Sequence, residues 1–424
     1  MIAVISIRRR AWLGSVNTLW GRLSVITDIE VGLTDQERAI RDSAHRFAEN
    51  VMRPAGKQLD QLADPQAVIA ADSILWDVFR QHRESGLNDL ESATMELSPL
   101  ERTRIRCLVS EEMGWGDSGL AISLGVSNFH KTFALMSGRQ SLIDRYVKSG
   151  KDEVGCWAVT EPDHGSDSLT VTERHFSDAS VRANCIATKD GDDYVIRGQK
   201  SAWVSNGSIA TVAALFCTID PSQGFKGGGV AVVPLTLPGV SRGRPTDKLG
   251  QRALNQGEIF FDDVRIPAEY MIVGSEAYSA VVEQILTGAN ASMGLMFVGV
   301  ARAAFEHALE YSKSRVQGGV PIFEHQSVKA RLFKMFAQVE AARSLSRRVA
   351  YYNATNPPLL QYSIASKVTS TNTAFEVASQ ALQIFGGNGL TKEFPMEKLM
   401  RDARASMIED GCNDILSLVG AAKL

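Results

Sequence analysis

Two adjacent carboxylates near the end of the chain are the residues whose type and spacing most directly suggest chemistry. The stretch "SMIEDGCNDI", residues 406 to 415, places Glu409 and Asp410 directly before Gly411. A carboxylate in apolar surroundings has a raised pKa and can act as a general base near neutral pH. The alternative is an ordinary solvated turn, and the rest of the sequence must decide between the two.

Other common catalytic signatures are missing from the sequence. Its seven histidines and five cysteines form neither an HExxH nor a CxxC pair, so we expect no metal site and a reducing compartment. There is no Walker sequence, and the one GxSxG match, "GVSRG" at residues 239–243, lies among β-rich runs without a helical pattern after it, so it is not the strand-to-helix elbow of a hydrolase. The glycine-rich "IFGGNGL" lacks GxGxxG spacing and follows a helical pattern instead of a strand. A bound cofactor would therefore use another kind of site.

Two stretches carry hydroxyl groups and tryptophan at predicted strand ends. "CWAVTEPDHGSD", residues 156–167, runs from a buried strand into a turn, and "SAWVSNG", residues 201–207, ends another strand with Trp203. An indole with nearby hydroxyls could form one wall of a site for a planar ring such as a flavin. Trp203 could equally be a core residue, with the hydroxyls serving as turn caps.

The elements that must position these residues fall into three segments. Residues 33–150 are predicted to be helical, beginning with a capping box of Thr34 and Glu37. Pro54 is predicted to end the first helix. Short β-rich runs then fill residues 151–270, with a hairpin turn at Gly191 and Asp192, and predict an antiparallel barrel or sandwich.

After Tyr270 the pattern is helical again. Long amphipathic stretches joined by short connections predict a C-terminal four-helix bundle over residues 271–424. The fold class is therefore α+β and mostly helical. The predicted helices cover residues 277–315, 323–352, 358–385 and 394–409.

Composition limits the possible partners. The chain has 424 residues and a formal net charge of -3, which gives no reason to expect nucleic acid. No apolar run reaches the roughly 20 residues of a membrane-spanning helix. Residues 1–32 form a basic extension that fits a mitochondrial transit segment, an upstream translation start or a loose extension. We expect a cytoplasmic protein if bacterial, or a matrix protein if this segment is a transit peptide.

Five segments resemble, in the same order, the signature segments of the acyl-CoA dehydrogenase flavoprotein family. They are "AVTEPDHGSD", "KSAWVSNG", "KLGQRALNQGEIFFDDVRIP", "EHQSV" and "QIFGGNGLTKEFPMEKLMRDAR". The resemblance extends over about residues 33–416. It implies helices, a β-barrel and a four-helix bundle, with one FAD per subunit of a homotetramer or dimer. It also implies that an acyl-CoA is converted to the trans-2-enoyl thioester and that an electron-transfer flavoprotein or similar acceptor receives the electrons.

The resemblance also implies roles for particular residues. One group would border the flavin, a second would reach the FAD of a neighbouring subunit, a third would lie beside the flavin near the base, and a fourth would contact substrate. Gly386 and Gly387 of the second group could equally be a helix C-cap. The groups are, in order, Trp157, Val159, Thr160, Trp203 and Ser205; Arg315, Gln317, His325, Gln326, Gln383, Gly386 and Gly387; Cys412 and Asp414; Ser166 and Asn290.

The opening stretch aligns with the segment that carries the family's catalytic base. The family usually has glutamate, glycine and threonine where this chain has Asp410, Gly411 and Cys412. The resemblance implies that Asp410 removes the α-proton, with Glu409 as the alternative, while a hydride passes from the β-carbon to flavin N5. The thioester carbonyl would be polarised by a flavin ribityl hydroxyl and the backbone N–H of the base.

Several positions depart from the family pattern. An aspartate base is typical of the related nitroalkane oxidase branch, Asn290 replaces a usual arginine, and Cys412 and Asp414 replace threonine and glutamate or glutamine. Three alternatives to ordinary acyl-CoA dehydrogenation follow: a nitroalkane oxidase using Asp410, an acyl carrier protein dehydrogenase, and a repurposed family member.

Overall fold

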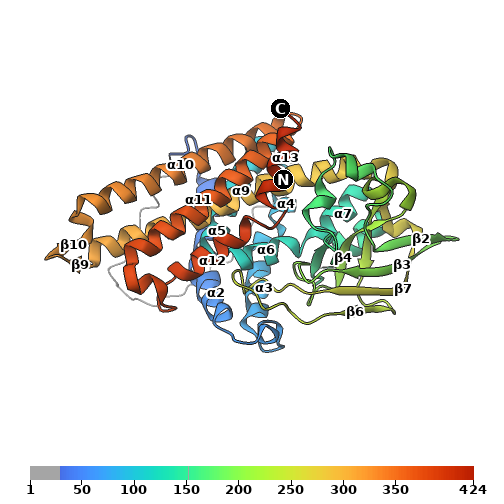
Figure 1. The fold of residues 1–424 in the computed structure, drawn as a ribbon, viewed down its shortest axis with the longest axis horizontal. Coiled ribbons are helices and arrows are strands. Elements are labelled where there is room, and N and C mark those ends of the chain that lie inside the picture. The colour runs from blue at the N-terminus through green and yellow to red at the C-terminus, as the bar shows by residue number, and fades with distance from the viewer. Residues whose placement is uncertain (1–28, 151) are drawn as a thin grey trace.

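The computed structural model describes residues 29–150 and 152–424. Almost all of the basic extension, residues 1–32, lies outside the described residues. Figure 1 shows a β-sheet at one end of the molecule and a small hairpin at the other, with long helices running between them. The mostly helical α+β class predicted from the sequence is confirmed.

The chain enters its first helix through the predicted capping box. In α1 (Asp35–Phe47), the Glu37 N–H donates to Thr34 Oγ1 at 3.2 Å, and the Thr34 N–H donates to the Glu37 carboxylate at 2.7 Å. The prediction that Pro54 ends this helix is wrong. A π-helical turn (Ala48–Met52) leads directly into α2 (Arg53–Asp60), so Pro54 occupies the first turn of α2, where its missing N–H is tolerated.

Most of the remaining N-terminal helices pack around one apolar cluster that also includes Ala253 and Ala303 from later segments, whereas the last two contribute Phe133, Ala134 and Leu142 to the core of the sheet. The Asp117 carboxylate caps α6 by accepting the Leu120 N–H at 2.9 Å. These helices are α3 (Ile74–Glu84), α4 (Leu90–Ala93), α5 (Pro99–Gly116), α6 (Ser118–Val126), α7 (Phe129–Ser137) and α8 (Gln140–Ile143).

The sheet contains the predicted hairpin. Strands β2 (Ile186–Asp190) and β3 (Asp193–Lys200) pair antiparallel, and Gly191 in their turn has a φ of 61°. The remaining strands of this sheet are β1 (Gly155–Ala158), β4 (Val212–Thr218), β5 (Gly228–Pro234), β6 (Val240–Arg242), β7 (Ile259–Pro267) and β8 (Met271–Val273).

The sheet is mixed, which corrects the prediction of an antiparallel unit. Its order is β6-β7-β3-β2-β4-β5-β8, with β1 also pairing to β4. The β1–β4 and β2–β4 pairs are parallel. Within the described residues no pairing joins β6 to β8, so a closed barrel is not seen. Every residue of β4 and β5 is buried, which places them at the centre of the β core.

The C-terminal helices agree with the predicted ranges to within a few residues, but a fifth helix was missed. They are α9 (Ser275–Ser314), α10 (Gln326–Thr355), α11 (Leu360–Phe385), α12 (Met396–Ser406) and the additional α13 (Asn413–Ala421), with a hairpin of β9 (Val316–Gln317) and β10 (Val320–Pro321) after α9. By length and composition α9 could cross a membrane, yet 61% of its apolar window is buried in the protein. It packs against α5, α10 and α11 as a central core helix.

Glycines allow α5 and α9 to approach closely. A Cβ at Gly299 would overlap the carbonyl oxygen of Glu111, and one at Gly114 would overlap that of Met296. A Cβ at Gly288, also in α9, would meet nothing within 4 Å.

We therefore expect Gly299→Ala to lower the free energy of unfolding by about 2 kcal/mol, because the two helix backbones must separate. Gly288→Ala is the matched control and should raise it by about 0.5 to 1 kcal/mol through helix propensity. Urea unfolding of both variants tests this. Equal effects of the two substitutions would contradict the close approach of α5 and α9.

Candidate active site

The two carboxylates lie in a strained turn between α12 and α13. Asp410 and Gly411 are consecutive left-handed residues, with φ of 53° and 90°. Such a conformation costs free energy for a residue with a side chain and favours glycine at the second position. The turn is closed by the Asn413 N–H, which donates to the Met407 carbonyl at 2.9 Å. Both Glu409 and Asp410 are half-buried, so this is not an ordinary solvated turn.

Hydrogen bonding distinguishes the two carboxylates. Gln251 Nε2 donates to Glu409 Oε1 at 2.6 Å. No residue in the described part of the chain donates to the Asp410 carboxylate. Burial raises the pKa of Asp410 above its ordinary value, and the charge of Lys367 opposes that rise. Burial and the neighbouring Asp410 raise the pKa of Glu409 to about 7. Asp410 therefore presents the carboxylate that is free to accept a proton from a ligand.

A buried lysine of α11, which was not predicted from the sequence, donates hydrogen bonds to this turn. Lys367 in α11 has no exposed surface, and its Nζ donates to the Gly411 carbonyl at 2.9 Å and to Asn413 Oδ1 at 2.8 Å. Burial lowers the pKa of Lys367 to about 8, although Asp410 and Glu409 act in the opposite direction. A lysine among small residues in "SIASKVTST" was the only available signal.

The predicted substrate residue Ser166 contacts this turn from the β unit. The Cys412 N–H donates to Ser166 Oγ at 3.0 Å, so the structure brings these two predicted residues together. The loop before Ser166 is fixed by a fully buried ion pair in which Lys200 Nζ lies 2.6 Å from Glu161 Oε1. The Cys185 N–H also donates to that carboxylate, at 3.1 Å.

The predicted flavin wall lies at the ends of β1 and β3. Ser201 joins the two strand ends through its N–H to the Thr160 carbonyl at 2.9 Å and its hydroxyl to Thr160 Oγ1 at 3.0 Å. Val159 is half-buried beside Thr160. The Trp203 side chain is 57% exposed, which excludes the core role considered from the sequence. The Trp157 ring packs against Phe129 and Phe216, yet its buried Nε1 has no hydrogen-bond partner among the described residues.

The loop between β6 and β7 connects this wall to the turn that carries Glu409 and Asp410, which we call the base turn. Gln256 Nε2 donates to the Trp203 carbonyl at 3.2 Å and to Ser205 Oγ at 3.4 Å, and Lys248 Nζ donates to Gln256 Oε1 at 2.5 Å. Gln251 from the same loop holds Glu409. Gln251 and Lys248 were not singled out from the sequence, because only the folded chain brings this loop between two distant segments.

These residues fit a planar aromatic cofactor. An exposed indole beside half-buried aliphatic and hydroxyl groups is an apolar surface that a bound ring would cover. The Trp157 N–H is a donor that finds no acceptor among residues 29–150 and 152–424. The chemistry of the donor set therefore agrees with a flavin at the ends of β1 and β3.

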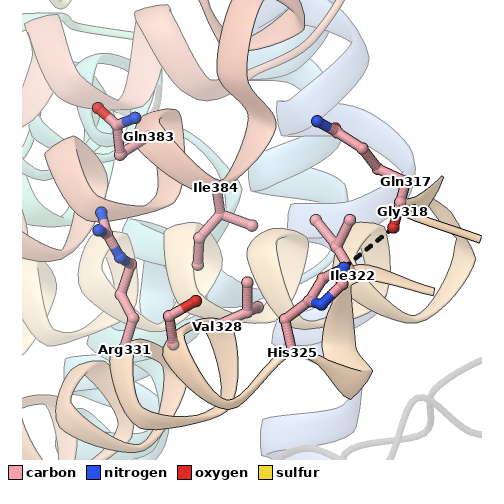
Figure 2. Close-up of a pocket in the computed structure, with 9 residues that line it drawn as sticks. Gln317, Gly318, Ile322, His325, Val328, Arg331, Gln383 and Ile384 are labelled. Atoms are coloured by element: carbon pink, nitrogen blue, oxygen red, sulfur yellow. Dashed lines mark hydrogen bonds between the residues drawn. The ribbon is translucent and has the colours of Figure 1, made fainter. Parts of the chain in front are cut away.

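Three residues of the second predicted group line a cavity of about 460 Å³ at the other end of the bundle. Figure 2 shows Gln317, His325 and Gln383 around it, with His325 Nε2 2.9 Å from the Gln317 carbonyl oxygen. Arg331, which was not predicted, also lines the cavity, and its Nη1 donates to Gln380 Oε1 at 2.9 Å. The sequence feature that could have indicated Arg331 is its position one helical turn beyond the "EHQSV" segment.

The other members of that group lie close by but outside the cavity lining. Arg315 is the exposed C-cap residue of α9, and Gln326 begins α10. Gly386 has a φ of 60° and caps α11, so the helix-cap role weighed from the sequence is present, with Gly387 following in a 3-10 turn.

The wall and the base turn lie near the middle of α9, whereas the far-end cavity lies beyond its C-terminal end. Trp157 packs in the cluster that contains Met293 and Phe297, and Ser366, next to Lys367, contacts Gly294. Helix α9 has 40 residues and is about 60 Å long at 1.5 Å per residue. It begins just after β8 and ends at Ser314, next to the β9–β10 hairpin that Figure 1 shows at the end of the molecule away from the sheet, so roughly 30 Å of helix separates its middle from the far-end cavity. One chain therefore does not bring the two predicted groups together around a single ligand.

Two predicted residues are not joined to the base turn by hydrogen bonds. Asn290 is fully buried, its Nδ2 donates to the Leu286 carbonyl at 2.9 Å, and its Oδ1 has no partner among the described residues. Asp414 is exposed in the first turn of α13, where a carboxylate interacts favourably with the helix dipole.

The raised pKa of Glu409 predicts a pH-dependent effect of its replacement. A folded pKa of about 7, above the ordinary value of 4.5, means that the folded state loses stability as the pH rises from 4.5 to 7. Glu409→Gln removes this loss, so we expect it to stabilise the protein by about 1 to 2 kcal/mol at pH 8 and little at pH 5. Urea unfolding at both pH values measures this, with exposed Glu173→Gln as the control. Equal stabilisation at the two pH values would contradict the assignment.

Comparison with known proteins gives one consistent result. Residues 156–264 match the family described as "Acyl-CoA dehydrogenase, middle domain", and residues 279–424 match "Acyl-CoA dehydrogenase, C-terminal domain". Together these ranges cover more than half of the chain.

Similar curated proteins span nearly the whole chain. The mitochondrial short-chain specific acyl-CoA dehydrogenase of Rattus norvegicus is 27% identical over 413 residues, covering 96% of this chain and 93% of that protein. The short-chain specific enzyme of Megasphaera elsdenii is 28% identical over 406 residues, covering 93% and 100%. The solved butyryl-CoA dehydrogenase from Megasphaera elsdenii superposes with a TM-score of 0.80 at 26% identity, covering 93% of this chain and 99% of that one.

Proposed function

Because the chain belongs to the acyl-CoA dehydrogenase family, we propose that it is an FAD-dependent enzyme that dehydrogenates an acyl-CoA thioester at the α and β carbons, with Asp410 as the base. The observation that carries this proposal is the difference between the two adjacent carboxylates. Glu409 is bound by Gln251, whereas the half-buried carboxylate of Asp410 accepts no hydrogen bond from the described residues.

The base would act on the proton α to the thioester carbonyl. Burial makes Asp410 more basic than an exposed aspartate, which favours proton removal near neutral pH. The Asp410 N–H also donates to no described residue, so it is available to the thioester oxygen as negative charge develops there. The Asp410 carboxylate would thus remove the α-proton while the backbone N–H of the same residue stabilises the thioester oxygen.

The wall residues would hold the cofactor against the substrate. Trp203 and Val159 supply apolar surface, and Thr160, Ser205 and the Trp157 N–H supply polar contacts at its edge. Bound FAD would supply the hydride-accepting chemistry, for which no side chain of the protein is suited. Ser166, held against the Cys412 N–H, would position the loop at the entrance from the β unit.

A composite cofactor site would require a second copy of the chain. The far-end cavity with Gln317, His325 and Gln383 lies roughly 30 Å along α9 from the part of that helix that packs near the wall, and no wall residue lines it. In a homo-oligomer, of which a tetramer is the expected form, this cavity would complete the cofactor site of a neighbour. The electrons would then pass to an electron-transfer flavoprotein or similar carrier.

The decisive test is an anaerobic titration of the purified yellow protein with saturated acyl-CoAs of increasing chain length, followed by flavin absorbance. We expect the wild type to bleach and Asp410→Asn to keep its flavin but bleach at least about 10²-fold more slowly, because the base contributes on that scale. Exposed Asp262→Asn is the control.

Two other outcomes would redirect the proposal. Turnover of nitroalkanes with peroxide release, without bleaching by any thioester, would show the oxidase instead. Bleaching only by thioesters of an acyl carrier protein would keep the reaction and change the carrier.

A further inference from the structure

The turn that carries Asp410 is attached to α11 by a set of side chains one helical turn apart. Lys367 binds the Gly411 carbonyl and Asn413 Oδ1, and Thr371 Oγ1 accepts from Asn413 Nδ2 at 3.0 Å. Asn372 Oδ1 accepts from the same amide at 3.1 Å. Residues 367 and 371 share a face of the helix, so α11 presents these groups to the turn as one surface.

We propose that Lys367 is a positioning residue for the base: its buried ammonium holds the left-handed turn from Asp410 to Asn413 and brings a positive charge to that turn. This inference rests on the proposed role of Asp410. Lys367 would contact neither substrate nor cofactor and acts only through the turn.

The burial of Lys367 supports this role. A lysine without exposed surface is costly unless its ammonium is both hydrogen-bonded and charge-compensated. Its two acceptors, the Gly411 carbonyl and the Asn413 amide oxygen, are neutral. The compensating charges are the carboxylates of Asp410 and Glu409. The lysine is therefore tied to the turn by hydrogen bonds and to the proposed base by charge.

The backbone conformation supplies a second reason. Asp410 and Gly411 adopt φ of 53° and 90°, which a free turn would leave easily. The bond from Lys367 to the Gly411 carbonyl fixes the peptide directly after Asp410. Without it, the turn would keep the Ser166 hydroxyl on the Cys412 N–H and the bonds of Asn413, but none of these holds the peptide directly after Asp410.

The charges around this turn determine the direction of the expected pH effect. The turn contributes Asp410, Glu409 and Cys412 near Lys367, and the loop from β6 to β7 contributes Lys248, which faces Glu409 and Asp402. Lys367 is the cation that lowers the pKa of Asp410 against the effect of burial. Removing its charge should raise that pKa, so a base that must be ionised becomes active only at higher pH.

The test compares Lys367→Met with Ser370→Ala in the intact flavoprotein. Ser370 lies in the same helix, is fully buried and bonds Ser346 Oγ at 2.9 Å, so its loss removes a buried hydrogen bond without touching the turn. The first readout is hydrogen–deuterium exchange of the peptide spanning residues 407–413, without substrate. We expect faster exchange in Lys367→Met and unchanged exchange in Ser370→Ala.

The second readout is the pH dependence of flavin bleaching by an acyl-CoA. We expect the acid limb in Lys367→Met to move up by about one pH unit or more, the usual effect of losing a nearby opposite charge. Should Lys367→Met not fold, Asn413→Ala removes one acceptor of Lys367 and should also accelerate exchange of the turn. An unchanged acid limb or unchanged exchange of the turn in the folded variant would overturn the proposal.

The two readouts separate this inference from the proposed function. If no thioester bleaches the wild-type flavin, the dehydrogenase proposal fails by itself. Exchange of the 407–413 peptide then decides alone whether Lys367 holds the turn.

Discussion

Buried charge at the junction of three chain segments is the constraint on which the rest of the structure depends. Starting at Glu409, a chain of contacts runs through Gln251 to Asp402, which also lies 2.5 Å from Lys398 Nζ. Lys398 Nζ is in turn 2.6 Å from Asp117, the residue that caps α6. Each charge loses its hydration on folding and needs its partner in place. The base turn, the loop after β6 and the N-terminal helices must therefore dock together.

The same constraint explains why the candidate site and the stability of the fold depend on the same residues. Gln251 adopts a left-handed φ of 50° to place its N–H on Asp402 and its side chain on Glu409. Trp157 belongs to the apolar core of the sheet on one side and to the bundle core on the other. The wall and the base turn are thus held by the packing between the sheet and the helices. Neither belongs to a flexible surface loop.

Local patterns predicted those elements whose cause is local. The capping box of Thr34 and Glu37 and the turn at Gly191 act over three or four residues, and both are present. The effect of Pro54 was misjudged because a π-helical turn absorbed it. The parallel pairing of β1 with β4 depends on a partner over 50 residues away, which periodicity within one strand does not reveal.

In the candidate site, too, the sequence indicated residues that belong to a local motif and missed residues whose role depends on distant partners. Asp410 was predicted because its segment resembles a family motif. Ser166 and Cys412, which the same resemblance had singled out, meet through a hydrogen bond of 3.0 Å. Lys367 carries no motif, and Gln251 and Lys248 lie within the segment "KLGQRALNQGEIFFDDVRIP" without being singled out, since the importance of all three arises from burial and from partners far along the chain. Helix α13 was missed because Gly411 reads as the end of a helix, while it also allows the next one to begin.

The length of α9 has a genetic consequence. In an oligomer of the proposed kind, each cofactor site takes its wall from one chain and its far-end cavity from another. A chain damaged near Trp203 and a chain damaged near Gln383 would each retain the half that the other lacks. Some sites in a mixed assembly would combine the two intact halves. Two defective alleles of one gene would then complement each other, as alleles of different genes ordinarily do.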